Sequence, residues 1–396
     1  MNPFEKDEAS CGRMEVVPTR ALRLLGPVMA GHESSSLESG QQGHGPPNQH
    51  DRLLIARKLL ASNWAAQDGG LAGRDRAGEA DMVAQRLVQQ ASAAMQRLVG
   101  DGATASLSIA QVMALESVMH VRGRPSLRIE DNSIESLTEA KHPGSGIWRL
   151  FLTQHETALV TSAAAAGAVV VKDNYSSRPH WVQGTVWLIR PDLAITNRHV
   201  LFPPQGLRLA RRRPEQLTAA RLKSDVTVTL DFALDNGTKR DIGYRIQEIL
   251  FVSQESDPID IAVLQVERIV NPAQPSPTPL HVVDATVDEW DMNRIFVIGH
   301  PGKVQAVPSD VAAVFGDPDE LKRVSFGELL DPDPQRTQDL VYDASTIGGF
   351  SGGCVLGFHD SPRVVALHYW GDPTRGNRAI MATALRAHAV NQILKI

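Results

Sequence analysis

The fold is decided by the stretch from Gly184 to Val200, which reads GTVWLIRPDLAITNRHV. Two apolar runs rich in β-branched residues flank Pro191-Asp192, a pair typical of a turn between two strands. The second run ends in Thr-Asn-Arg-His, so His199 is expected where a β-hairpin ends. Most histidines are surface residues or hydrogen-bonded core residues. His199 is therefore a candidate for chemistry only if suitable partners exist elsewhere in the chain.

Similar short runs lie before and after this hairpin, separated by Gly, Pro, Asn and Asp. The strand candidates are Ala168–Val171, Gly184–Ile189, Val226–Phe232, Ile261–Val266, Ile295–Ile298, Cys354–Gly357 and Val364–His368. Many short strands at this spacing favour an all-β sandwich or barrel over alternating βαβ units. The segment Thr383–Ile396 has apolar residues at helical spacing and predicts a closing helix.

The first 150 residues have a different character. Residues 1–50 include a Gly-, Ser-, Gln- and Pro-rich stretch, which predicts a disordered linker. Further along, apolar residues such as Val83, Leu87 and Leu98 recur at three- and four-residue spacing. Residues 51–150 are therefore expected to form a small α-helical N-terminal region. Its helices either pack on each other or bind a regulatory protein partner, and the sequence leaves both readings open.

Composition limits the function further. The chain has 396 residues, of which 42% are hydrophobic and 21% charged, with a formal net charge of −5. Wholesale disorder is excluded, and nucleic acid is not an expected partner because no global basic field exists. The cysteines and histidines show no metal-ligand spacing, so no metal and no cofactor is expected. No run could span a membrane and the acidic start is unlike a secretory leader, so a cytoplasmic location is predicted.

The sharpest local signal for catalysis is GFSGG at 349–353. Glycines around Ser351 allow a tight turn whose N–H groups can face an oxyanion. A glycine-rich turn with an incidental serine is the alternative. Because serine is inert without a base and the base needs an orienting acid, a carboxylate is also required. Asp260, at the mouth of an apolar strand, suits that role, and Asp257, a turn residue before proline, is its competitor.

The order His199, Asp260, Ser351 resembles the trypsin-like serine peptidases of the chymotrypsin fold, in particular the bacterial branch that includes the glutamyl endopeptidases. Five segments carry the resemblance: TNRHV at 196–200, DIAVL at 260–264, IGHPG at 298–302, GFSGG at 349–353 and VALHYWG at 365–371. The resemblance covers residues 157–396 at its widest. It implies two six-stranded antiparallel barrels, at about 160–275 and 285–380, with the active site between them and a C-terminal helix.

The resemblance also implies the reaction, which is hydrolysis of peptide bonds in a protein or peptide substrate through an acyl-enzyme. Ser351 would be the nucleophile, His199 the general base and Asp260 the group that orients the imidazole. The backbone N–H groups of Gly349 and Ser351 would form the oxyanion hole. The alternative is a catalytically weak binding or adaptor protein built on the same fold.

Four further residues are expected around the substrate side chain. By resemblance, Ser345 and Thr346 would line the base of the specificity pocket, with His368 and Gly371 on its wall. No carboxylate stands where it would attract Lys or Arg, so tryptic cleavage is not expected. Thr346 with His368 is the polar pair associated with preference for an acidic residue before the cleaved bond. The alternative for His368 is a buried strand histidine satisfied by its neighbours.

Several features depart from the family or lie outside it. Phe350 stands where the family has Asp or Asn, so activation by an ion pair with a newly cut N-terminus is not expected. Val186 stands where glycine is common. The basic segment LRLARRRP at 207–214 is interpreted as a solvated surface loop, with docking of an acidic partner or nucleic acid as the alternative. The N-terminal region could restrain a protease that has no visible activation cut.

Overall fold

The structure is a computed structural model of the whole chain. It describes residues 89, 93, 97, 123–131, 133–142, 144–177, 179–202, 207–233, 242–269, 276–284, 294–302, 315, 319–334, 336–358, 363–372 and 376–396. Apart from 89, 93 and 97, which are helical, the predicted linker and helical region up to residue 122 lie outside the described residues. The chain forms two contact units, and the larger comprises Ser117–Phe202, Arg208–Gly371 and Gly376–Ile396.

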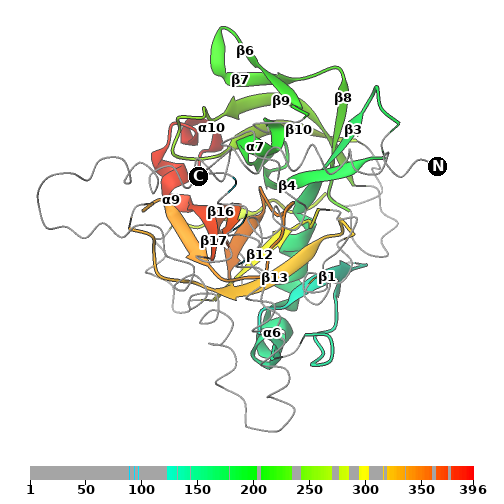
Figure 1. Cartoon of the computed structure of the whole chain (residues 1–396), viewed down its shortest axis with the longest axis vertical. Coiled ribbons are helices and arrows are strands. Elements are labelled where there is room, and N and C mark those ends of the chain that lie inside the picture. Colours follow the sequence, from blue (N-terminus) through cyan, green and yellow to red (C-terminus); the bar gives the residue numbers. More distant parts are fainter. Residues whose placement is uncertain are drawn as a thin grey trace, which may run out of the picture. The chain divides into compact units, whose positions relative to one another are not determined.

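A first antiparallel barrel lies within this larger unit (Figure 1). Its six strands are β3 (Ala166–Asp173), β4 (Trp181–Arg190), β5 (Leu193–Thr196), β8 (Val226–Asp231), β9 (Gly243–Val252) and β10 (Ala262–Ile269). They follow the order β10-β5-β4-β3-β8-β9, and pairing of β9 with β10 closes the ring. The predicted turn at Pro191-Asp192 connects β4 to β5, because Ile195 lies opposite Trp187 in an antiparallel pair.

The second barrel is built from the strands that follow. They are β12 (Arg294–Gly299), β13 (Arg323–Glu328), β14 (Asp339–Tyr342), β15 (Cys354–Gly357), β16 (Arg363–Asp372) and β17 (Gly376–Met381). The order is β14-β17-β16-β15-β12-β13, and a bridge between Leu329 and Tyr342 joins β13 back to β14. A short strand, β11 (His281–Val282), pairs in parallel with β16. The predicted class, two six-stranded antiparallel barrels, is confirmed.

The segment before the first barrel differs from the expected helical N-terminal region. This segment contains β1 (Ser126–Glu130) and β2 (Ser133–Ile134), and β1 pairs with β13 of the second barrel. Leu127 and Ile129 alternate with polar residues and are buried, which is the period of a half-buried strand rather than a helix. The helix α6 (Gly146–Ala164) then crosses the expected domain start at 157 and buries Trp148 against Phe326 and Phe358.

The basic segment expected as a loop is instead part of a β-hairpin. Strand β6 (Ala210–Arg213) pairs with β7 (Gln216–Leu222), and β7 in turn pairs with β9. Arg212 links this hairpin to the first barrel. Its guanidinium lies 5.1 Å from the ring centre of Phe202 and donates to the backbone oxygen of Ser253, so it is anchored to the barrel.

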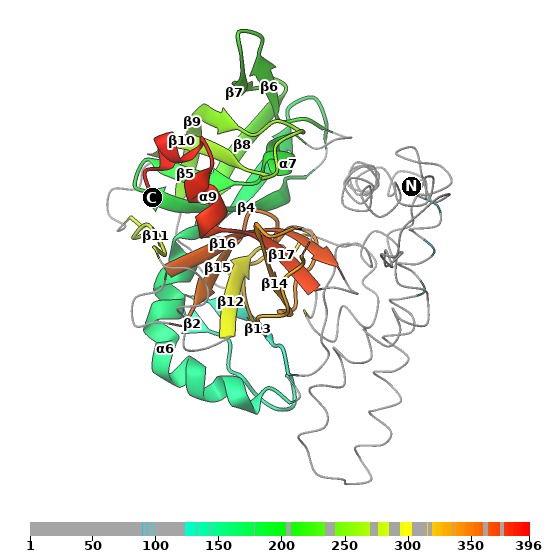
Figure 2. The same ribbon diagram turned by 90° about the vertical axis from the view of Figure 1, so that its left-hand side faces the viewer.

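The C-terminal segment is helical as predicted, but it forms two short helices, α9 (Ala382–Ala387) and α10 (Asn391–Leu394). The break falls at His388, whose extended backbone (φ −83°, ψ 153°) cannot continue a helix. Arg190 of β4 donates to the backbone oxygens of Ile393 and Leu394, which ties this end of the chain to the first barrel. Figure 2 shows the C-terminus beside the strands of that barrel. Among the described residues, no helix is long and apolar enough to cross a membrane.

Candidate active site

His199 and Asp260 meet at one end of the β5–β10 pair. Thr196, the last residue of β5, lies opposite Ala262, the first residue of β10. Because the two strands run antiparallel, the residues that follow β5 and the residues that precede β10 lie at the same end of the pair. His199 follows in the short helix α7 (Arg198–Leu201), and its Nδ1 lies 2.7 Å from Asp260 Oδ2. The backbone N–H of His199 also donates to Asp260 Oδ1 at 3.1 Å.

The carboxylate of Asp260 is buried and held from several sides. Only 7% of the residue is exposed, and the amide of Asn197 donates to its backbone oxygen at 2.8 Å. The guanidinium of Arg198 lies 3.9 Å from Oδ2 and is anchored by the backbone oxygen of Gln254. An ionised carboxylate next to Nδ1 selects the imidazole form that carries a proton on Nδ1. Arg198 adds a positive charge that favours the ionised carboxylate.

Asp257, the other candidate for the acid that orients the imidazole, stabilises a turn instead. Its Oδ2 accepts the backbone N–H of Gln254 at 2.5 Å, and the N–H of Asp257 donates back to the oxygen of Gln254. This reciprocal pairing is typical of an aspartate that stabilises a turn. Of the two candidate acids, Asp260 is the one that contacts His199.

The segment that carries Ser351 is fastened to the first barrel at Thr185 of β4. The backbone N–H of Thr185 donates to the oxygen of Ser351 at 2.8 Å. A Cβ placed on Gly184 would lie 3.1 Å from that same oxygen and 2.7 Å from a methyl group of Val200. The structure therefore brings the backbone of Ser351 and the residue that follows His199 to the same glycine.

The turn around Ser351 has the backbone shape that its glycines predict. Gly349 and Gly352 have φ values of +105° and +88°, a region that residues with a Cβ rarely adopt. The N–H groups of Phe350, Gly352 and Gly353 are used by the backbone oxygens of Ile347, His368 and Phe350 respectively. The hydroxyl of Thr185 donates to the oxygen of Gly349 at 2.9 Å, which orients the peptide unit that follows it.

Phe350 occupies the position where the resemblance leads one to expect Asp or Asn. Its side chain is fully buried, and a Cβ on Gly299 would lie 2.5 Å from its ring. The ring of Phe315 packs against it edge-on, with ring centres 6.2 Å apart. The residue before Ser351 is thus held by apolar packing.

The four predicted substrate-pocket residues are buried, and three have identified side-chain partners. Ser345 donates to the backbone oxygen of Arg124 at 2.9 Å, and Thr346 donates to the amide oxygen of Asn377. His368 Nδ1 lies 2.7 Å from the hydroxyl of Tyr342. Burial raises the pKa of Tyr342 well above its ordinary value, so this hydroxyl stays neutral. Gly371 lies in β16, three residues beyond His368.

Some residues that shape this region could not be predicted from the sequence. Arg124 lies outside the family resemblance, and Asn377 and Tyr342 belong to strands that were not expected. Thr185 lies in the predicted hairpin segment Gly184–Val200, but its role depends on the distant Gly349, so no local pattern could have indicated that role. In the part of the chain that is described, no group of three His, Cys, Asp or Glu side chains could hold a metal ion.

Two closed antiparallel barrels, a buried His–Asp contact and a serine in a glycine-rich turn define a trypsin-like architecture. Residues 184–367 match the family model of the trypsin-like peptidase domain, which supports a peptidase of this class. No curated protein matches the chain.

Among solved structures, the chain is similar to the Rv3671c protease in its inactive form, with 16% identity and a TM-score of 0.34, covering 61% of this chain and 95% of that one. It is also similar to the active form of the Rv3671c protease from M. tuberculosis, with 14% identity and a TM-score of 0.36, covering 60% of this chain and 84% of that one. Both similarities are weak.

Proposed function

We propose that the chain is a serine endopeptidase that cleaves peptide bonds with Ser351, His199 and Asp260. The observation that carries the proposal is the 2.7 Å contact between His199 Nδ1 and Oδ2 of the buried Asp260. Both residues belong to the first barrel, and the segment that carries Ser351 is hydrogen-bonded to Thr185 of the same barrel. A histidine held in this way carries its proton on Nδ1, so Nε2 is in the form that accepts a proton.

The proposed reaction has two halves. Ser351 Oγ attacks the peptide carbonyl carbon while its proton passes to His199 Nε2, and the carbonyl oxygen becomes an oxyanion that the N–H groups of Gly349 and Ser351 stabilise. The C–N bond then breaks, and the leaving amine takes the proton from His199. A water molecule, deprotonated by His199, attacks the acyl-enzyme and releases the acid product with Ser351 restored. Asp260 stabilises the charged imidazolium in both halves.

The test is labelling with a fluorophosphonate, which reacts with an activated serine. The wild-type protein should be labelled and should cleave members of a peptide library, whereas Ser351→Ala should do neither. Asp260→Asn should fold and lose about 10⁴-fold in kcat, because the amide favours the wrong imidazole tautomer. A wild-type protein that takes up no label would favour the alternative, a binding or adaptor protein.

Preference for an acidic residue before the cleaved bond is the finer part of the proposal, and it depends on His368. If the neutral Tyr342 hydroxyl donates to Nδ1, the imidazole proton sits on Nε2, the form that can donate to a carboxylate. Thr346 contributes less to binding of a substrate carboxylate than the sequence led us to expect, because its hydroxyl already donates a hydrogen bond to Asn377. Cuts after Glu or Asp in the library would support this preference, and cuts after small or apolar residues would discard it.

Regulation by the N-terminal region, and the cytoplasmic location, remain proposals from the sequence. Deleting residues 1–116, which belong to the other contact unit, tests the regulatory role. A changed rate of peptide cleavage would support it, and unchanged activity together with unchanged protein binding would contradict it.

A further inference from the structure

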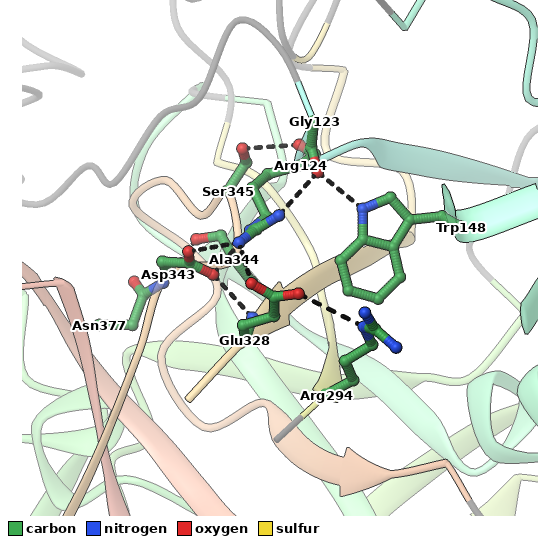
Figure 3. A network of polar contacts seen from close by, with 9 residues as sticks. All are labelled: Gly123, Arg124, Trp148, Arg294, Glu328, Asp343, Ala344, Ser345 and Asn377. Carbon is green, nitrogen blue, oxygen red and sulfur yellow. Dashed lines mark hydrogen bonds and ion pairs between the residues drawn. The ribbon is translucent and has the colours of Figure 1, made fainter. Parts of the chain in front are cut away.

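Arg124, in the segment just before β1, makes a buried ion pair with Asp343 (Figure 3). The guanidinium donates from Nε to Oδ1 and from Nη2 to Oδ2, both at 2.8 Å, and Nη2 also contacts Glu328 at 2.7 Å. Arg124 is 5% exposed and Asp343 is 4% exposed. This two-point geometry fixes direction as well as distance, because the planar guanidinium matches the planar carboxylate.

The pair is joined directly to the segment that leads to the predicted specificity pocket. Asp343 follows β14 and precedes Ser345 and Thr346 by two and three residues. The backbone oxygen of Arg124 also accepts the hydroxyl of Ser345 at 2.9 Å. Arg124 therefore holds this segment at two points, once through its side chain and once through its backbone.

The opposite side of the segment is held independently. The amide of Asn377, in β17, donates to the oxygen of Ala344 at 2.6 Å and accepts the hydroxyl of Thr346. Residues 343–346 thus lie between Arg124 on one side and Asn377 on the other. A substitution of Arg124 would remove the two side-chain bonds to Asp343, whereas the backbone bond to Ser345 and the bond from the N–H of Glu328 to Asp343 Oδ1 at 2.7 Å would remain.

Arg124 itself is rigidly placed. Trp148 of α6 donates its indole N–H to the oxygen of Gly123 at 2.6 Å, and its ring lies 5.6 Å from the guanidinium carbon. Next to Arg124, the oxygen of Pro125 accepts the N–H of Phe326, which begins the pairing of β1 with β13. Burial alone would lower the pKa of Arg124, but the hydrogen bonds and charges of Asp343 and Glu328 outweigh it, and the pKa is raised. The guanidinium therefore keeps its charge.

We propose that Arg124 is a positioning residue for substrate binding, which holds residues 343–346 in the shape that the substrate side chain requires. This inference rests on the proposed peptidase function. The turn that carries Ser351 has its own supports, because Gly302 donates to the oxygen of Gly348 and Phe350 donates to the oxygen of Ile347. Arg124 accordingly acts on substrate affinity more than on the reactivity of Ser351.

The test compares full-length wild type with Arg124→Gln, using a fluorophosphonate and the best peptide from the library. The number of active sites is first counted with the label. Per active site, Arg124→Gln should raise KM for the peptide by about 10-fold or more, while the labelling rate of Ser351 stays close to wild type. The matched control is Arg294→Gln. Arg294 contacts the same Glu328 at 3.3 Å but has no contact with Asp343 or Ser345 among the described residues, and its KM should not change.

A second variant separates positioning from folding. Arg124→Gln leaves the Asp343 carboxylate buried without its cation and can lower stability or yield. The double variant Arg124→Gln/Asp343→Asn replaces the pair with two neutral amides, so stability should recover while KM stays raised, because the two-point geometry is still lost. An unchanged KM in Arg124→Gln, or a KM that recovers together with stability in the double variant, would overturn the positioning role. Absence of label on the wild type would instead refute the proposed function on which this role rests.

Discussion

Single residues show how this interior accommodates ionisable side chains. The carboxylates of Asp260 and Asp343 are buried with cations beside them, Arg198 in one case and Arg124 in the other. His300 is treated differently. Its Nδ1 lies 3.0 Å from the oxygen of Glu320, and burial, together with the charge of Lys322, lowers its pKa to about 3. The folded protein thus holds this imidazole neutral.

We predict that His300 makes the protein less stable as the solution becomes acidic. In the unfolded chain an imidazole takes up a proton below about pH 6.5. Between about pH 6.5 and pH 3 the unfolded state therefore binds more protons than the folded state, and the free energy of unfolding falls as the pH falls. Urea unfolding at pH 7 and pH 5 measures the effect. From pH 7 to pH 5, the free energy of unfolding of the wild type should fall by about 2 kcal/mol more than that of His300→Gln. Equal decreases would contradict the prediction.

At the scale of elements, the turn between β14 and β15 depends on the space that glycine leaves. A Cβ on Gly352 would lie 2.0 Å from the oxygen of Thr185 and 2.4 Å from the hydroxyl of Thr196. Both atoms belong to strands of the first barrel, so the turn cannot relax without separating from that barrel. The glycines of the GFSGG motif are therefore required by packing as well as by the chemistry of an oxyanion site.

We predict opposite effects for two glycine-to-alanine substitutions. Gly352→Ala should lower the free energy of unfolding by more than about 2 kcal/mol, because a strained backbone and a clash with backbone atoms act together. Gly146→Ala, at the start of α6, meets nothing within 4 Å and should raise it by up to about 1 kcal/mol through helix propensity. Urea unfolding of both variants checks the signs. Similar stabilities for the two would show that the turn tolerates a side chain.

The N-terminal elements show where sequence patterns reach their limit. The strand β1 is five residues long, and its partner β13 lies about two hundred residues later, with Ser126 opposite Ser325. A short strand has weak local preference, and its pairing is decided by packing with distant residues. The helical expectation for 51–150 therefore missed β1 and β2, and the domain start expected at 157 falls inside α6.

At the scale of the peptidase unit, Thr185 is one of the residues that join the two barrels. The hydroxyl of Thr185, in the first barrel, donates to the oxygen of Gly349 and accepts the backbone N–H of His300, both in the second barrel. The backbone oxygen of Thr185 accepts the hydroxyl of Thr196, three residues before His199. The geometry around Ser351 is thus coupled to the segment that carries His199.

We predict that Thr185→Val lowers kcat by about 10-fold or more, because the peptide that links Gly349 to Phe350, between the two proposed oxyanion donors, loses its hydrogen bond, and one oxyanion donor is worth about 10²–10³-fold. It should also cost about 1–3 kcal/mol of stability, since the buried N–H of His300 loses its acceptor. Thr185→Ser keeps the hydroxyl and is the matched control. Peptide cleavage and urea unfolding of both variants give the comparison. Equal activities for Val and Ser would mean that the hydroxyl does not orient Gly349.

The sequence by itself indicated an all-β sandwich or barrel, most of its longer strands and the candidate catalytic residues, and the resemblance to the trypsin-like peptidases added the expectation of two barrels. Short runs of alternating or apolar β-branched residues between turn signals carry that information locally, and the strands containing Val186, Val263 and Val365 lie where they were expected. The motifs around His199, Asp260 and Ser351 are local as well, because each needs only a few neighbouring residues to set its backbone. The strand after the Pro191-Asp192 turn was expected as well, and it is β5, whereas β9, β13, β14 and β17 were not identified.

Only the tertiary structure decided which of these residues meet and what surrounds them. The contact of Asp260 with His199 depends on the register of β5 with β10. The hydrogen bond that the Thr346 hydroxyl donates to Asn377 depends on the pairing of β14 with β17. Arg124 reaches Asp343 across 219 positions of sequence. Such contacts form because burial forces each polar group to find a partner, and the nearest partner in space is set by the packing of whole strands.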